Sequence, residues 1–208
     1  MPVLRNHTKK TKAFSLLLLC LLILFAAGCS NDAPDADSDA PDTSAPLGGG
    51  YAQLIHSEAA LEIFREGTIA TVRDVETGIT YQVRRAIGGF NTLADVETLT
   101  PEDTERLLET AGGDWNIRRR AVIVYIGDYR IAASITPFQH LGCENSPFGE
   151  IVDNRSGSTG TGINLNYIQG NGMIGVVDIY FWNSLMPGIN RPCERHQEMV
   201  LRAYQYEG

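Results

Sequence analysis

The most apolar run after residue 28 spans residues 173–184 (MIGVVDIYFWNS) and alternates between two faces. β-branched and aromatic residues dominate it, and glycine-rich sequence precedes it, which is typical of a buried central strand. Alternation places Val177 and Ile179 on one face and Asp178 on the other. A carboxylate within such a strand must be paired, hydrogen-bonded, protonated or placed at a cleft, so Asp178 is a candidate functional residue.

Two further pairs of apolar runs are each joined by a short turn that contains glycine. The pairs are 68–75 with 79–87, and 119–126 with 129–135. This arrangement is typical of β-hairpins. Residues 141–172 are rich in Gly, Asn and Ser, and we expect them to be irregular, with one short strand near 163–168.

Helix signals occur at residues 57–66, 100–112 and about 192–204. The first and last carry apolar residues at helical spacing, and the second begins with Thr100 as a cap and Pro101 at the first helical position. Hairpins that lie between separate helices predict one α+β domain. We expect a mainly antiparallel sheet of about five to six strands, with about three helices.

The N-terminus has the three parts of a bacterial export signal: a basic start, an uncharged apolar segment at 13–27, and small residues after it. The apolar segment is short for a transmembrane helix. Residues 25–29 (FAAGC) resemble the lipobox of bacterial lipoproteins. That resemblance implies removal of residues 1–28, a diacylglycerol on Cys29, and a lipid-anchored protein on the extracytoplasmic face of the cell membrane. An ordinary secretory signal and an uncleaved anchor are the alternatives.

Composition divides the rest of the chain. Residues 29–50 are rich in Asp, Ala, Pro and Ser and predict a disordered acidic tether, whereas residues 51–208 have the length of one globular domain. Without residues 1–28 the chain has no lysine, and thirteen arginines stand against twenty-five acidic residues, a formal net charge of −12. This charge argues against nucleic acid or an anionic lipid surface as a partner. The absence of lysine excludes Schiff-base chemistry and a Walker-type phosphate loop.

Cys143 and Cys193 are the two cysteines left for the folded domain, because Cys20 lies in the signal and Cys29 is the lipidation site. An even pair in an extracytoplasmic protein predicts a disulfide. It would close a loop of about fifty residues, worth on the order of 4 kcal/mol in the chain-entropy model. Two free thiols, or one catalytic cysteine, are the alternatives.

His140, His196 and Asp178 are the candidate catalytic residues. His140 lies three residues before Cys143, and His196 three residues after Cys193, so a disulfide would bring the two histidines together. With Asp178 they could orient a general base or bind a metal. The alternatives are a core His196, a surface His140 and a structural Asp178. No compact metal-ligand motif is present, and we predict neither a metal nor a cofactor.

Trp115, Arg118, Arg119 and Arg120 are candidates for ligand binding. The arginines could hold a carboxylate or a phosphate, and the tryptophan could stack on a sugar. The alternative for the arginines is a solvated edge paired with the many acids.

Four segments of the chain carry a resemblance: 95–104 (DVETLTPEDT), 115–122, 133–140 and 183–197. Over residues 69–204 the chain resembles an uncharacterised domain at the C-terminal end of cell-envelope and peptidoglycan-associated proteins of Bacillota. Those relatives carry GHFCIHF where residues 175–181 read GVVDIYF, and their layout is similar to that of the L,D-transpeptidases. Asp178 takes the place of the cysteine, which implies that this copy does not perform that reaction.

We therefore expect a lipid-anchored envelope protein that binds cell-wall or other envelope material without catalysis, with peptidoglycan as a candidate partner. One alternative is a hydrolase or transferase that acts on peptidoglycan through His140, His196 and Asp178. Another is a structural partner of an envelope complex. The sequence does not indicate the oligomeric state.

Overall fold

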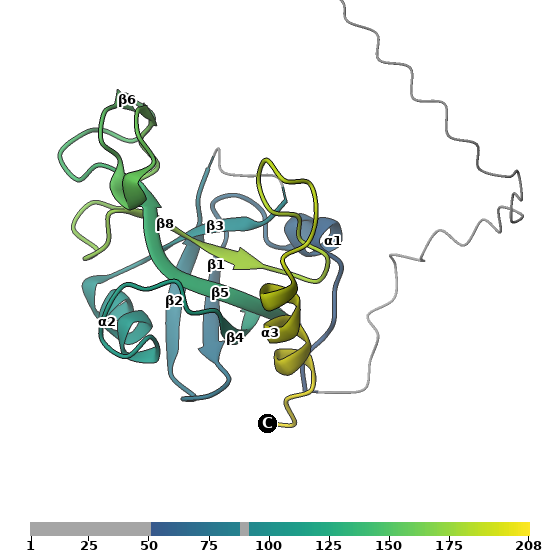
Figure 1. Ribbon diagram of the computed structural model, residues 1–208. Helices are drawn as coiled ribbons and strands as arrows, with labels where there is room; N and C mark the ends of the chain where they lie inside the picture. The colour runs from purple at the N-terminus through teal and green to yellow at the C-terminus, as the bar shows by residue number, and fades with distance from the viewer. Residues whose placement is uncertain (1–50, 88–91) are drawn as a thin grey trace, which may run out of the picture. The chain divides into compact units, whose positions relative to one another are not determined.

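Six antiparallel strands form a closed barrel in the computed structural model, which describes residues 51–87 and 92–208 (Figure 1). Around the barrel the strands follow the order β1 (Ile69–Asp74), β2 (Thr80–Arg85), β3 (Ala94–Thr98), β8 (Gly175–Tyr180), β5 (Tyr129–Leu141) and β4 (Arg120–Ile126). The predicted α+β class, the antiparallel sheet and both hairpins are confirmed. The sequence did not predict closure into a barrel, nor strand β3.

Three α-helices lie around the barrel in the described part of the chain: α1 (Ser57–Ile63), α2 (Pro101–Thr110) and α3 (Glu194–Tyr204). Phe64, just after α1, and Leu107 of α2 are buried in the barrel core. Helix α3 packs on the outside, over β4 and β5 (Figure 1), where Val200 meets Ile123 and Ala132. Thr100 caps α2 as predicted, and its side chain accepts a hydrogen bond from the Asp103 amide.

Apolar and polar residues alternate along the strands, and the apolar side chains that point inward fill the barrel. Val177 and Ile179 of β8 point inward with Val72, Val96 and the other members of one buried cluster. The predicted alternation of the central strand is thus confirmed, and Asp178 is on the outer face. Flanked by β3 and β5, β8 has no free edge.

Strand β5 continues well beyond the predicted end at residue 135. Thr136 pairs with Asp178 and His140 with Val176, so four steps along β5 oppose two along β8, and a bulge separates the two pairs. Pro137 lies in this bulge, where a missing backbone N–H is tolerated. The Pro137 carbonyl accepts a hydrogen bond from the Asn116 amide at 2.8 Å.

Residues 142–174 form a lobe at one end of β5 and β8 (Figure 1). It holds the two-stranded pair β6 (Ile151–Val152) and β7 (Gly162–Ile163) and the short 3-10 helix η1 (Ser156–Ser158). The predicted irregularity of this segment is confirmed. Of the short strand predicted near 163–168, only the two-residue β7 is present. The strand ends at Ile163, because the side chains of Asn164 and Asn166 bond to the backbone of the lobe and of Gly175.

The predicted signal segment 1–28, Cys29 and the predicted tether 29–50 lie outside the described residues. No helix within residues 51–87 and 92–208 has the length and apolarity to cross a membrane.

Candidate functional site

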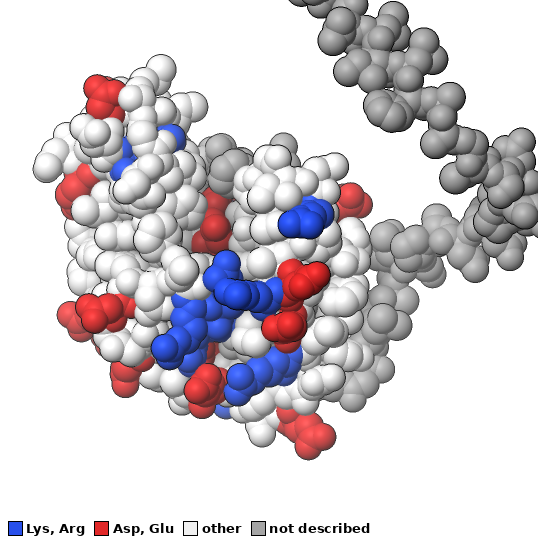
Figure 2. All heavy atoms as spheres, in the orientation of Figure 1, with Lys and Arg blue, Asp and Glu red and all other residues white. Residues whose placement is uncertain are grey.

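The outer face of the barrel carries two carboxylates side by side. Asp95 of β3 pairs directly with Asp178 of β8. Asp95 is buried, with 2% of its surface exposed, while the Asp178 side chain keeps 23%. Figure 2 shows the surface hollowed over β3 and β8, between the lobe of residues 142–174 and the segment before α3, with acidic atoms at the bottom. We call this region the hollow.

His140, which belongs to β5, lies beside the two carboxylates. Its Nε2 lies 3.2 Å from Asp178 Oδ1, and one ligand atom each from Asp95, His140 and Asp178 lie within 4.8 Å of one another. We refer to these three residues as the acid–histidine cluster. His140 Nδ1 lies 3.1 Å from the Phe138 carbonyl, which can only accept, so Nδ1 carries the proton and Nε2 faces the carboxylates.

The surroundings of His140 favour its charged form. Burial alone would lower its pKa, but the Asp178 carboxylate, the Phe138 carbonyl and the charge of Asp95 together raise the pKa above the ordinary 6.5. The imidazole and Asp178 are therefore an interacting acid–base pair at the hollow.

His196 occupies a different environment. Its ring stacks on Tyr180 with centroids 3.7 Å apart, and its two nitrogens bond to Ser134 Oγ at 2.9 Å and Thr136 Oγ1 at 3.1 Å. Burial, with a smaller effect of the Arg119 charge, lowers its pKa to about 3. His196 is thus a neutral, buried and fully bonded histidine that is held against β5 through Ser134 and Thr136.

A groove of about 750 Å³ lies between residues 111–119 and α3. Arg118, Arg119 and Arg195 line it, together with Asp114 and Glu198. Figure 2 shows basic side chains gathered beside α3. We call this surface the arginine groove.

Arg119 is the half-buried arginine of this groove. Its Nη1 donates to the Ile117 carbonyl at 2.9 Å, while its Nε is buried and has no hydrogen-bond partner among the described residues. A buried N–H group nearly always has an acceptor, so this nitrogen can donate to an oxygen of a water or of a bound ligand at the groove.

The other two residues predicted for ligand binding have structural contacts. Arg120 is buried, and its guanidinium donates to both oxygens of Asp74, at 2.9 and 2.7 Å. That pair links β4 to the end of β1. Trp115 is half-buried against the barrel core. Of the predicted set, only Arg118 and Arg119 line the groove.

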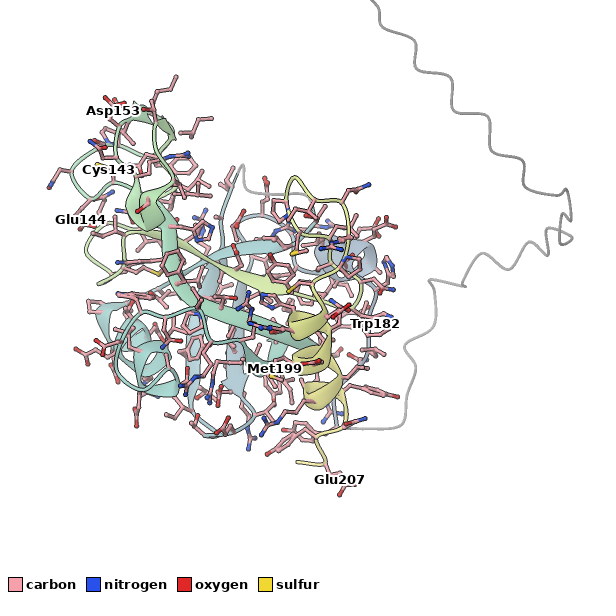
Figure 3. The ribbon with its side chains drawn as sticks, viewed as in Figure 1. Cys143, Glu144, Asp153, Trp182, Met199 and Glu207 are labelled. Atoms are coloured by element: carbon pink, nitrogen blue, oxygen red, sulfur yellow. The ribbon has the colours of Figure 1, made fainter. Side chains whose placement is uncertain are left out.

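The two cysteines of the domain flank the hollow. Cys143 lies in the lobe that carries β6 (Figure 3), and Cys193 is the residue before α3. Both are half-buried thiols here. The disulfide between them stays a prediction.

The sequence did not predict Asp95 or Glu97 as site residues. Glu97 is buried on the same face as Asp95, and its carboxylate accepts from the Tyr167 and Ile168 amides, which fixes that loop over β3. A usable signal existed: residues 94–98 (ADVET) alternate small or apolar with acidic residues.

Comparison of the chain with protein-family models, curated proteins and solved structures gave no match.

Proposed function

We propose that this protein is a lipid-anchored, extracytoplasmic binding protein whose barrel holds an anionic polymer of the cell envelope in the arginine groove. The observation that carries the proposal is the buried Nε of Arg119 with no acceptor among the described residues. A guanidinium presents several N–H donors in one plane, which suits carboxylates and phosphates.

Charge and size support the same ligand class. The chain without its signal has a net charge of −12, which repels polyanions at long range, so attraction has to come from a local group of arginines. Arg118 and Arg195 are exposed at the groove beside Arg119. A volume of about 750 Å³ is in the range of pockets that take small-molecule-sized groups. Peptidoglycan, whose peptide stems carry carboxylates, is the partner we propose.

Sedimentation with isolated cell-wall sacculi tests this proposal. Residues 30–208, produced without the lipid, should pellet with sacculi and leave the muropeptide profile unchanged by mass spectrometry. Arg119→Gln and Arg195→Gln should each weaken retention about tenfold, since each removes a charge-assisted hydrogen bond. Salt should weaken it as well.

Arg65→Gln is the matched control, because Arg65 is exposed and its side chain donates a local hydrogen bond to the Glu62 carbonyl. It should retain full binding. Absence of pelleting, or pelleting of both groove variants as strong as that of the unmodified chain, would overturn the proposal and leave a structural role in an envelope complex.

A second candidate function is a hydrolase or transferase that acts on peptidoglycan. The pair His140 Nε2–Asp178 Oδ1 at 3.2 Å, partly exposed at the hollow, favours it, because general acid–base catalysis needs such a pair within reach of substrate. New or lost muropeptides that disappear with His140→Ala would establish this function in place of simple binding.

The lipid anchor is tested separately in cells. Cys29→Ala should abolish incorporation of labelled palmitate and move the protein from the membrane fraction to the soluble extracytoplasmic fraction. Unchanged labelling of the variant would contradict the anchor.

A further inference from the structure

The acid–histidine cluster has the composition of a metal site, with one imidazole and two carboxylates. Its members come from three neighbouring strands: Asp95 from β3, Asp178 from β8 and His140 from β5. Their ligand atoms lie within 4.8 Å of one another. A first-row divalent metal binds nitrogen and oxygen at about 2.0–2.2 Å, which places adjacent ligand atoms about 3–3.5 Å apart. The 3.2 Å between His140 Nε2 and Asp178 Oδ1 matches that spacing.

The ring of His140 is already oriented as a ligand. Nδ1 donates to the Phe138 carbonyl, which leaves Nε2 to face the carboxylates. Metal-binding histidines typically donate their second ring nitrogen to a backbone carbonyl or a carboxylate, because this fixes the tautomer and the plane of the ring.

Electrostatics supplies an independent argument for a cation. Carboxylates directly opposite on paired strands repel each other. Asp178 Oδ1 is buried and lies 3.2 Å from His140 Nε2, with a carboxylate oxygen of Asp95 within 4.8 Å of the ligand atoms of both residues. A divalent ion placed between the Nε2 lone pair of a neutral His140 and the two carboxylates would be attracted to all three groups.

The backbone around His140 is rigid, as a preformed site requires. Gly157 and Gly175 both have positive φ, and a Cβ on Gly157 would stand 2.6 Å from the His140 Cβ. A Cβ on Gly175 would stand 2.1 Å from the His140 carbonyl oxygen. Glycine backbone therefore packs tightly against His140 on two sides and limits its movement.

We propose that Asp95, His140 and Asp178 bind one divalent transition-metal ion at the floor of the hollow. The mixed nitrogen and oxygen donors favour Zn²⁺, Mn²⁺ or Fe²⁺ over Ca²⁺ and Mg²⁺, which prefer oxygen alone. Three protein ligands leave at least one coordination position for water or a ligand. The Asp178 side chain, 23% exposed, marks the side from which solvent reaches it. This site is separate from the arginine groove and stands whether or not the groove binds cell wall.

Calorimetric titration of residues 30–208, after dialysis against EDTA, tests the site with Zn²⁺, Mn²⁺, Mg²⁺ and Ca²⁺ as probes. We expect one Zn²⁺ per chain, much tighter binding of Zn²⁺ than of Mg²⁺ or Ca²⁺, and a rise in the melting temperature. Asp178→Asn, which preserves shape, and His140→Gln should each reduce Zn²⁺ affinity at least about 100-fold. Circular dichroism confirms that each variant is folded.

Two control variants distinguish metal binding at this site from binding by other side chains of the protein. Asp128→Asn, in the exposed β4–β5 turn, should bind as the unmodified chain does. Cys143→Ser/Cys193→Ser should also bind normally, and the Co²⁺ complex should lack a thiolate charge-transfer band. Absence of saturable binding, unchanged affinity in the Asp178 and His140 variants, or a thiolate band would overturn the proposal.

Discussion

Gly142 and Gly175 pack backbone against backbone where β5 ends and β8 begins. The contact is so close that a Cβ on Gly142 would stand 2.2 Å from the Gly175 nitrogen. Gly175 also has a φ of +89°, which L side chains rarely adopt. The contact begins two residues after His140. It therefore anchors the strand end that carries the histidine of the acid–histidine cluster.

Gly175→Ala should destabilise the domain strongly. The new Cβ meets strain at positive φ, about 1–2 kcal/mol, and a clash with fixed backbone that adds about 1–3 kcal/mol. Urea unfolding measures the sum. Gly170→Ala is the matched control, since its φ is +76° and nothing lies within 4 Å of the added Cβ. Equal losses in the two variants would contradict the close packing.

His196 should make stability depend on pH. Its pKa is about 3 in the folded chain, lowered mainly by burial and next by the charge of Arg119, against 6.5 as its ordinary value. Between these values the unfolded chain binds a proton that the folded chain does not, so stability is complete above pH 6.5 and falls as the pH is lowered. This one group should cost about 2 kcal/mol between pH 7 and pH 5.

The measurement is the difference in unfolding free energy between the two pH values, for the native chain and for His196→Gln. Glutamine keeps polar atoms near Ser134 and Thr136 but does not titrate. The pH dependence should be smaller in the variant. An identical dependence in both chains would show that His196 is protonated in the fold.

Arg120→Ala should cost about 3–5 kcal/mol, because it leaves the buried carboxylate of Asp74 without its guanidinium partner. Arg106→Ala removes an exposed pair with Glu102 and should cost less than about 1 kcal/mol. Denaturant titration of both variants makes the comparison. A small loss in Arg120→Ala would mean that the turn after β1, whose amides also bond to Asp74, is sufficient to hold that carboxylate.

Mass spectrometry of peptides tests the predicted disulfide directly. Chain exported to an oxidising compartment should show Cys143 and Cys193 linked in one peptide pair after non-reducing digestion. The bond would tie the two sides of the hollow together, since Cys143 lies in the lobe and Cys193 precedes α3. Alkylation of both thiols in the native, unreduced protein would refute it.

Local patterns predicted most of the barrel. The hairpins β1–β2 and β4–β5, the cap of α2 and the inward face of β8 depend on contacts between near neighbours in sequence, and the structure confirms them. Closure of the sheet depends on the pairing of β1 with β4 and of β3 with β8. No local signal specifies such long-range pairs.

The cluster was only partly predictable for the same reason. Asp178 and His140 were identified, but Asp95 was not, because its short strand carries two acids that sequence rules assign to solvent. The sequence brought His140 and His196 together through a predicted disulfide, with Asp178 as the carboxylate that joins them, whereas in the structure the part of β5 beyond the bulge brings His140 to Asp178.

The bulge of β5 has one more consequence. Its two consecutive carbonyls face different candidate sites: Pro137 accepts from Asn116 in the wall of the arginine groove, and Phe138 accepts from the ring of His140. Two adjacent peptide units, joined at Phe138, thus stand between the two sites. If an ion at His140 shifts these units and alters groove affinity by some factor, thermodynamic reciprocity requires a groove ligand to alter ion affinity by the same factor. A single backbone segment would then couple the two binding events, so that each could be measured through its effect on the other.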